Sequence, residues 1–387
     1  MTARSIRPSR HLSVLSVACL LALGAACGGD AGGKKTPETK AGAHGPAKEA
    51  SKAGPASKIP DLSAAQVLER AKPLFRKLPT VMEWADNPVT DAKVELGRML
   101  YYDARLSKNQ DISCNTCHDL GKYGVDPRGT PTSKGHKGQM GDRNSPTVYL
   151  AALQLAQFWD GRAPTVEAQA KMPILNPVEM AMPDEKAVVG VLKSIPGYAE
   201  TFKAAFPEAA DPITYDNMAK AIGAFERRLV TPAPFDKFLA GSMGALDKKQ
   251  LWGLQLFMDV GCTTCHTGPG LGGTMFQKLG SVKPWSTQDE GRFKITQNEA
   301  DKFVFKVPLL RNIAKTGPYL HDGSIADLGE MVQKMAEHQT AKGKLSEAEL
   351  DAMLAFLDSL TGELPKDLIA KPTLPESGPS TPKPDPS

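Results

Sequence analysis

The sequence predicts a mostly α-helical fold, with two cytochrome c-like domains built on one plan. Three observations support this prediction. The pentapeptide Cys-x-x-Cys-His occurs twice, at 114–118 and 262–266. A segment with helical apolar spacing precedes each copy, at 96–103 and 252–259, with a Gly, a Leu, an aromatic residue and an Asp in matching places. A second amphipathic helix follows each copy, and no convincing alternating strand pattern is present. At 387 residues the chain is long enough for two domains.

The first 27 residues have the pattern of a bacterial export signal. Arg4, Arg7 and Arg10 precede an apolar run over 12–26, and small residues precede Cys27. The run is short for a membrane span. We therefore expect a signal peptide of the lipoprotein type, with a lipid anchor at Cys27, although Gly24 replaces the usual Leu and ordinary cleavage stays open. The mature protein is then exported, periplasmic and membrane-anchored if Cys27 is lipidated.

Composition and helical spacing define the remaining segments. Residues 28–60 contain almost no large apolar side chains and predict a flexible linker. The N-terminal domain is expected over 61–232 and the C-terminal domain over 233–363, with closing helices at about 216–230 and 346–360. Ser346 and Glu349 form a capping-box pattern. Residues 364–387 are rich in proline and predict a disordered tail.

The two pentapeptides indicate two covalently bound haem c groups. Cys114 and Cys117, and likewise Cys262 and Cys265, can each bond one porphyrin, while His118 and His266 follow as proximal iron ligands. A redox Cys pair or a zinc site requires no His directly after the second Cys. The net charge of +4 is small and predicts no nucleic-acid partner. Since c-type haem is attached outside the bacterial cytoplasm, the haem motifs agree with export.

Longer strings around these motifs carry a family resemblance. They include 143–148 (RNSPTV), 157–162 (QFWDGR), 176–180 (NPVEM), 305–312 (FKVPLLRN) and 318–323 (PYLHDG). Over roughly 80–362 the chain resembles the bacterial dihaem cytochrome c peroxidases, including their MauG-related members. The resemblance implies a peroxidatic first haem and a second haem through which electrons enter.

At the first haem, the resemblance implies His136 as a displaceable sixth ligand, within a loop rich in glycine. It implies Glu179 as the general acid and base, Gln169 as the residue that polarises the O–O bond, and Trp159 as a bridge for electrons between the haems. Without the resemblance, a loop His, a surface Glu, a surface Gln and a core Trp are the simpler interpretations.

At the second haem, a thioether ligand would raise the reduction potential. Met275, Met331 and Met335 are the candidates, and a Met stripe on a helix over 327–341 is usually core filling. The resemblance selects Met335. It also implies one calcium ion held by the side chain of Asn144 and the carbonyl oxygens of Thr316 and Pro318.

The resulting prediction is reduction of hydrogen peroxide to water with electrons from a small exported c-type cytochrome or a cupredoxin. By analogy with the family, a homodimer is expected. Alternatives are a dihaem electron-transfer cytochrome without peroxidase activity, a MauG-like protein-oxidising enzyme, and a haem-based peroxide sensor. The protein-oxidising enzyme carries Tyr in the place of Met335, which argues against that alternative here.

Overall fold

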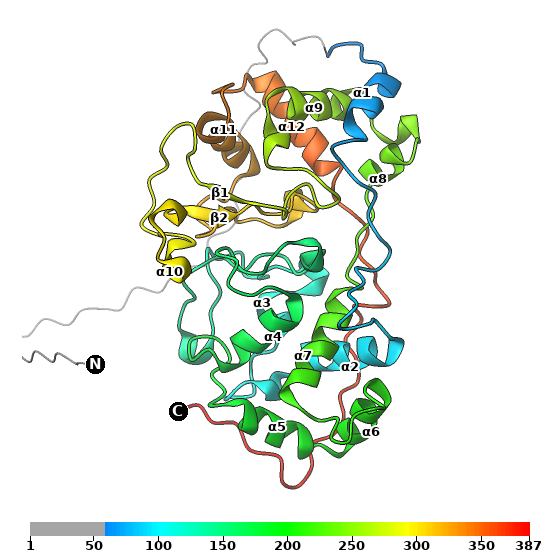
Figure 1. Cartoon of the computed structure of the whole chain (residues 1–387), viewed down its shortest axis with the longest axis vertical. Coiled ribbons are helices and arrows are strands. Elements are labelled where there is room, and N and C mark those ends of the chain that lie inside the picture. Colours follow the sequence, from blue (N-terminus) through cyan, green and yellow to red (C-terminus); the bar gives the residue numbers. More distant parts are fainter. Residues whose placement is uncertain (1–58) are drawn as a thin grey trace, which may run out of the picture. The chain divides into compact units, whose positions relative to one another are not determined.

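The computed structural model describes residues 59–387, which fold into two helical halves, each with its own core (Figure 1). The predicted signal peptide (1–27), which includes Cys27, lies outside the described residues, as do residues 28–58 of the predicted linker. Among the described helices, none has both the length and the apolarity to cross a bilayer. The helices are α1 (Ala64–Ala71), α2 (Asp91–Tyr102), α3 (Cys114–Cys117), α4 (Val166–Leu175), α5 (Glu185–Lys193), α6 (Pro196–Ala205), α7 (Tyr215–Glu226), α8 (Pro234–Leu239), α9 (Lys248–Asp259), α10 (Phe293–Thr296), α11 (Leu328–Gln339) and α12 (Glu347–Asp358).

The helices predicted before and after each pentapeptide are confirmed as α2 and α7 in the first half and as α9 and α12 in the second. Side-chain caps fix where they begin. The Thr90 hydroxyl accepts a hydrogen bond from the backbone amide of Lys93 at the start of α2. Ser346 and Glu349 form the predicted capping box of α12. The helix predicted over 327–341 is α11.

The internal repeat is visible in the way these helices cross. A Cβ atom added to Gly97 in α2 would lie 1.9 Å from the Ala221 carbonyl oxygen of α7. A Cβ atom added to Gly253 in α9 would lie 1.9 Å from the Ala352 carbonyl oxygen of α12. Glycine at matching positions therefore lets both helix pairs cross with their backbones in contact.

Residues 59–387 contain one small sheet, which the sequence pattern did not predict. β1 (Phe276–Lys278) pairs antiparallel with β2 (Val304–Lys306), and Gln277 lies opposite Phe305. Strands of three residues are too short to produce a recognisable alternation. The pair fixes the start of the 305–312 string, where the Lys306 amide donates to the Trp159 carbonyl of the first half at 2.8 Å.

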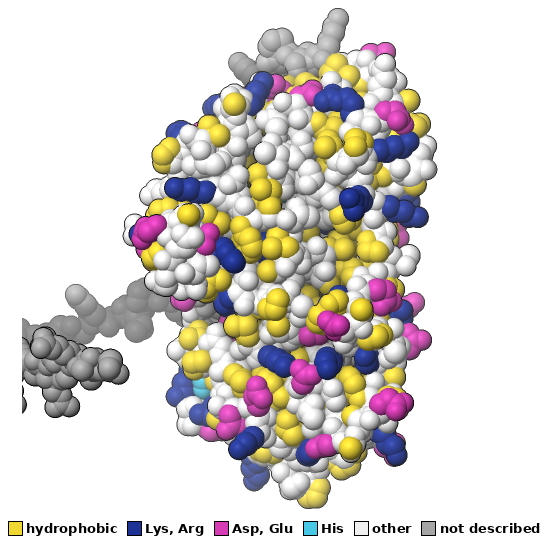
Figure 2. Space-filling view, viewed as in Figure 1, with side chains coloured by type: hydrophobic (Ala, Val, Ile, Leu, Met, Phe, Trp, Pro, Cys, Tyr) yellow, Lys and Arg dark blue, Asp and Glu magenta, His cyan; other side chains and the backbone are white. Residues whose placement is uncertain are grey.

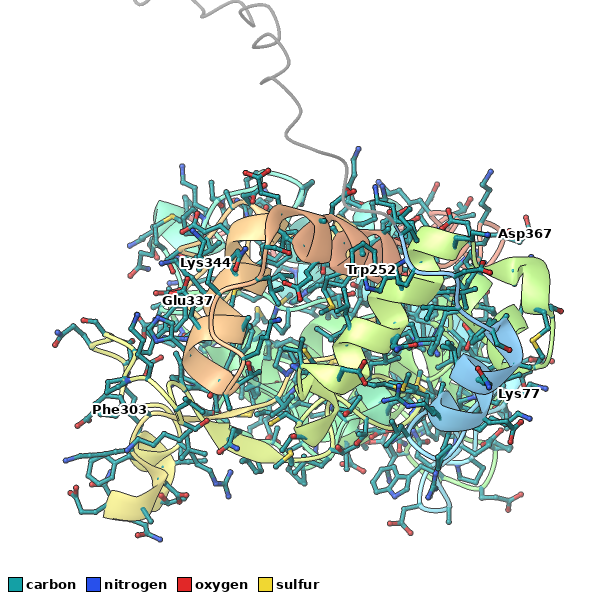
Figure 3. All side chains as sticks on the ribbon, turned by 90° about the horizontal axis from the view of Figure 1, so that it is seen from above. Lys77, Trp252, Phe303, Glu337, Lys344 and Asp367 are labelled. Atoms are coloured by element: carbon teal, nitrogen blue, oxygen red, sulfur yellow. The ribbon has the colours of Figure 1, made fainter. Side chains whose placement is uncertain are left out.

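The two ends of the described chain cross to the opposite halves, which differs from the predicted domain boundaries. α1 lies within the predicted N-terminal domain, but its Val67 and Leu68 pack in the core of the second half. Figure 3 shows this segment, which continues to Lys77, beside α9, on which Trp252 lies. The packing of α1 against α9 buries these side chains.

The proline-rich tail is also ordered, contrary to the predicted disorder. Leu368 and Ile369 pack against the core of the first half, and residues 364–387 continue past α6 and α5 (Figure 1). The Tyr102 hydroxyl donates to the Ile369 carbonyl at 2.6 Å, and Arg105 donates to the Pro375 carbonyl at 2.9 Å. Composition alone missed these contacts because they depend on donors about 270 residues earlier in the chain.

Candidate haem sites

The first pentapeptide forms one short helix that faces a cavity. Ser113 caps α3, with its amide bonded to the Thr116 hydroxyl at 3.0 Å. Cys114 and Cys117 lie one helical turn apart. Together with His118 they line what we call the first cavity. Burial raises the pKa of Cys114 to about 12, so this thiol stays protonated at neutral pH.

His118 is arranged as a metal ligand. Its Nδ1 lies 3.4 Å from the Gly124 carbonyl oxygen. An Nδ1–H donated to this carbonyl leaves Nε2 unprotonated, the tautomer that binds iron. Burial lowers the pKa of His118, although the Gly124 and Pro146 carbonyls oppose this shift. The lowered pKa keeps the imidazole neutral. The two thiols and this ring form the donor set that haem c requires, so the site fits the group.

Three of the predicted first-haem residues, Trp159, Gln169 and Glu179, line the same cavity. Gln169 lies on α4, and Glu179 lies in the turn that follows it. The Asn176 amide donates to Glu179 Oε1 at 2.8 Å. Burial raises the pKa of Glu179, although the Asn176 hydrogen bond and the charge of Arg162 oppose the shift. The structure therefore brings together a carboxyl group and an amide beside the first Cys-His motif.

His136 is the exception among these residues, because its side chain is absent from the lining of the first cavity. The ring is buried, and its Nε2 lies 3.3 Å from the backbone oxygen of Ser387 in the tail. The His136 amide donates to the carbonyls of Val178 at 3.0 Å and Glu179 at 2.9 Å. These bonds fix the loop against the backbone of Glu179. The structure thus does not bring the predicted sixth ligand to the first motif.

The second pentapeptide lines a second cavity with Cys262, Cys265 and His266. His266 Nδ1 lies 3.0 Å from the Leu271 carbonyl oxygen, so Nε2 is again free to bind iron. Burial lowers the pKa of His266 to about 4, which keeps the ring neutral. This donor set fits a second haem c as well as the first set does.

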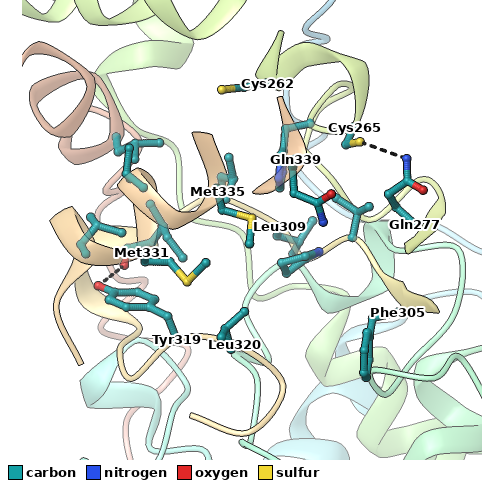
Figure 4. Close-up of a pocket in the computed structure, with 18 of the residues that line it drawn as sticks. Cys262, Cys265, Gln277, Phe305, Leu309, Tyr319, Leu320, Met331, Met335 and Gln339 are labelled. Atoms are coloured by element: carbon teal, nitrogen blue, oxygen red, sulfur yellow. Dashed lines mark hydrogen bonds between the residues drawn. The ribbon is translucent and has the colours of Figure 1, made fainter. Parts of the chain in front are cut away.

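Two of the candidate methionines, Met331 and Met335, line the second cavity. Both lie on α11, one turn apart. Figure 4 shows both side chains among the lining residues, with Met331 beside Tyr319. Met331 is buried in an apolar cluster with Tyr319 and Ile325, which accounts for it as core packing. Met275 does not line the second cavity.

The two cavities share one wall. The residues that line both are Asn144, Pro146, Thr147, Gln154, Phe158, Trp159 and Lys306. The Trp159 indole N–H donates to the Asn144 carbonyl at 2.9 Å, which fixes the ring in this wall. Trp159 therefore lies in the wall between the two cavities.

Lys306 and Glu226 are two cavity residues that sequence reasoning missed. Lys306 is buried in the shared wall, where it contacts Gln154, and burial lowers its pKa to about 7. Glu226 ends α7 and lines the first cavity, and burial, with Glu167, raises its pKa to about 8. A Lys in a strand and a Glu on an amphipathic helix have no distinctive spacing. Only the membership of Lys306 in the 305–312 string could have pointed to it.

The predicted calcium ligands Asn144, Thr316 and Pro318 all line the second cavity. The Asn144 Nδ2 donates to the Pro131 carbonyl at 3.0 Å, so its Oδ1 stays available to a cation. No cluster of three or more His, Cys, Asp or Glu side chains suited to a metal is found within 59–387. Amide and backbone oxygens are the ligand types that calcium accepts.

Comparison with known proteins gives consistent matches over both halves. A family model described as di-haem cytochrome c peroxidase matches residues 91–244, and a cytochrome c model matches residues 252–361. Cytochrome c551 peroxidase of Pseudomonas aeruginosa is 44% identical over 323 residues, covering 82% of this chain and 92% of the relative.

A more distant relative is the methylamine utilization protein MauG of Methylorubrum extorquens, 34% identical over 313 residues, covering 77% of this chain and 86% of the relative. Among solved structures, a MauG-like protein associated with microbial copper homeostasis has a TM-score of 0.69 at 29% identity, covering 77% of this chain and 97% of the other. With two Cys-x-x-Cys-His sites in two cytochrome c-type domains, and with identity of this level over most of its length, the chain belongs to the family of di-haem cytochrome c peroxidases.

Proposed function

We propose that this protein reduces hydrogen peroxide to water with electrons from a small c-type cytochrome or cupredoxin. One hydrogen peroxide, two protons and two electrons give two water molecules, and two equivalents of a one-electron donor are oxidised. The observation that carries the proposal is the first cavity, where Glu179 and Gln169 lie beside the Cys-His motif. The name of the relative in Pseudomonas aeruginosa supports it.

Glu179 supplies proton transfer at this site. When bound, the haem at the first motif supplies the iron that binds peroxide and the electrons that split the O–O bond. The Glu179 carboxylate accepts a proton from the oxygen of hydrogen peroxide that remains bound, and returns it to the oxygen that leaves as water. The Gln169 amide donates a hydrogen bond to the peroxide and stabilises the charge that develops on the leaving oxygen.

His136 controls access to the first cavity. A ring nitrogen bound to the iron would block peroxide, and in the structure the His136 ring lies against the tail and does not line the first cavity. Six glycines between 121 and 141 allow the loop to rearrange. His136 is therefore the displaceable sixth ligand in this proposal.

Electrons enter through the second site in the proposed cycle. Met335 supplies a thioether ligand there, which raises the reduction potential relative to a second nitrogen ligand. Trp159 lies in the wall that both cavities share, and it shortens the path between them. Calcium held by Asn144, Thr316 and Pro318 would fix this same region.

On the viewed face, acidic and basic side chains are interspersed (Figure 2), which fits the small net charge.

Export to the periplasm, a lipid anchor at Cys27 and a homodimer belong to the same proposal. The haem motifs support export, because covalent attachment of haem c takes place outside the cytoplasm. Mass spectrometry of the mature N-terminus tests the anchor, and sedimentation tests the dimer.

The deciding experiment is peroxide turnover by the haem-loaded protein with a reduced cytochrome c. Glu179→Gln keeps the shape of the side chain and removes its proton transfer, so we expect a loss of about 10²-fold to 10⁴-fold. Glu208→Gln, at an exposed position, is the matched control. A Glu179→Gln rate equal to that of the wild type would remove Glu179 from the chemistry.

Two alternatives have distinct signatures. A MauG-like protein-oxidising activity is represented among the relatives, but the candidate Met335 in the second cavity argues against it. A plain electron carrier would keep both irons six-coordinate. Cyanide binding to the first site after half-reduction excludes the carrier, and its absence would favour it.

A further inference from the structure

We infer that the end of the proline-rich tail, with Lys108 as a positioning residue, holds His136 away from the first cavity and so sets how readily that site accepts a ligand. The inference rests on the proposed function, because it takes His136 to be the displaceable sixth ligand. It adds a part of the chain, residues 364–387, to which the haem motifs assign no role.

The tail is bound along its length by donors from α2 and the loop after it. Arg98 donates to the Ala370 carbonyl at 3.0 Å, and Gln110 donates to the Pro382 carbonyl at 2.7 Å. Proline has no N–H, so an extended proline-rich segment offers carbonyl acceptors and needs few donors in return. Its restricted backbone also loses less entropy on docking than an ordinary segment loses.

Lys108 is the centre of the contacts at the tail's end. Its carbonyl accepts the Asp385 amide at 3.0 Å, and its ammonium donates to the Ser387 backbone oxygen at 2.8 Å. Its own amide donates to the Met180 carbonyl at 2.8 Å, directly after Glu179. Lys108 thus connects the tail to the turn that carries the proposed acid–base residue.

His136 completes the arrangement. Its Nε2 lies 3.3 Å from the same Ser387 oxygen that accepts from Lys108. Nε2 cannot contact Ser387 and bind an iron at the same time, and a ring in this position does not line the first cavity. A Cβ atom added to Gly135 would lie 2.1 Å from the Val178 carbonyl oxygen, so the loop fits this position closely. Tail contact and iron ligation by His136 are therefore alternatives, and each contact to the tail favours the open site.

The test removes residues 384–387 from the full-length, haem-loaded protein. The readout is electron spin resonance of the first haem in the half-reduced state, with the rate of cyanide binding as a second measure. Among the contacts removed is the one between His136 and Ser387, and loss of one such hydrogen bond shifts an equilibrium constant by about 2-fold to 12-fold, so we expect the ratio of His-ligated to open first site to rise by at least about 2-fold and cyanide binding to slow. Lys108→Met, which keeps the backbone bonds, should show a smaller change in the same direction.

Two controls make the result specific. Lys366→Met, at an exposed tail position, should change neither signal. In a His136→Ala background, removal of 384–387 should have no effect on cyanide binding, because that variant has no His136 ring that could bind the iron. An unchanged spin state after truncation, or an equal effect in both backgrounds, overturns the inference. A His136→Ala protein with the same resting spectrum as the wild type would instead overturn the proposed ligation by His136.

Discussion

Glu179 is held in two opposing environments, and its protonation depends on both. Burial raises its pKa, while the Asn176 amide stabilises the ionised form through a 2.8 Å hydrogen bond. A general base must be ionised in the free enzyme, so activity falls as the pH drops through this pKa.

Asn176→Ala should therefore move the acidic limb of the pH–rate profile to higher pH. Removing a donor to the carboxylate destabilises the charged form and raises the pKa of Glu179 further. The measurement is kcat/KM for peroxide between pH 4 and pH 8. An acidic limb that stays in place would show that another group controls it.

The two methionines of α11 provide a matched pair for the second site. Met335→Leu should remove the sulfur ligand and lower the reduction potential of the second haem, because a thioether favours the reduced iron. Met331→Leu conserves volume in an apolar cluster and should leave the potential nearly unchanged. Redox titration of both variants separates the two roles, and the reverse pattern would make Met331 the ligand.

At the level of single residues, the sequence was informative where the chemistry demands fixed spacing. Two thiols and an imidazole on one haem can only be arranged in a few ways, so both motifs were predictable. Lys306 and Glu226 became visible only in the structure, since their environment is built from segments distant in sequence. The position of His136 depends on the tail and was unpredictable for the same reason.

Among the secondary-structure elements, the crossings of α2 with α7 and of α9 with α12 tolerate no side chain at Gly97 or Gly253. Gly97→Ala and Gly253→Ala should each destabilise the protein by about 1–3 kcal/mol, because the added methyl group meets a backbone carbonyl. Gly190→Ala in α5 has open space and should stabilise by about 0.5–1 kcal/mol. Urea unfolding of the holo-protein compares the three, and equal midpoints for Gly97→Ala and Gly190→Ala would contradict this account.

The positions of the helices could be predicted from neighbouring residues, whereas the elements against which they pack could not. Caps and apolar spacing depend on neighbouring residues, so α7, α11 and α12 were placed to within a few residues. The packing of α1 on the second half and of the tail on the first depends on surfaces completed late in the chain. Composition favoured disorder for the tail because it counts apolar residues and ignores the donors that face it.

For the whole molecule, an ion cluster connects the two halves. Arg143 and Asp160 come from the first half and Asp289 from the second, with Arg143 Nε 2.6 Å from Asp289 and Arg143 Nη1 2.7 Å from Asp160. Burial alone would raise the pKa of Asp289, but the hydrogen bonds and charge of Arg143 hold it well below its usual range.

Because the folded-state pKa of Asp289 is depressed, its contribution is fully present above the unfolded-state value of about 3.9 and is lost as the pH falls below it. Asp289→Asn should therefore lower the free energy of unfolding at pH 6 and make it less dependent on pH between 5 and 3. Asp351→Asn, from an exposed ion pair between Lys249 of α9 and Asp351 of α12, is the control. Equal pH dependence in wild type and Asp289→Asn would exclude this role.

The exchange of chain ends between the halves has a consequence for biosynthesis. α1 is made well before α9, on which its apolar side packs (Ala64–Ala71 against Lys248–Asp259). The first half, in turn, lacks the packing of residues 364–387 until that segment has been made. Neither half can therefore complete its packing before the other has been made. Each half expressed alone should aggregate, and co-expression of the two halves should restore soluble protein.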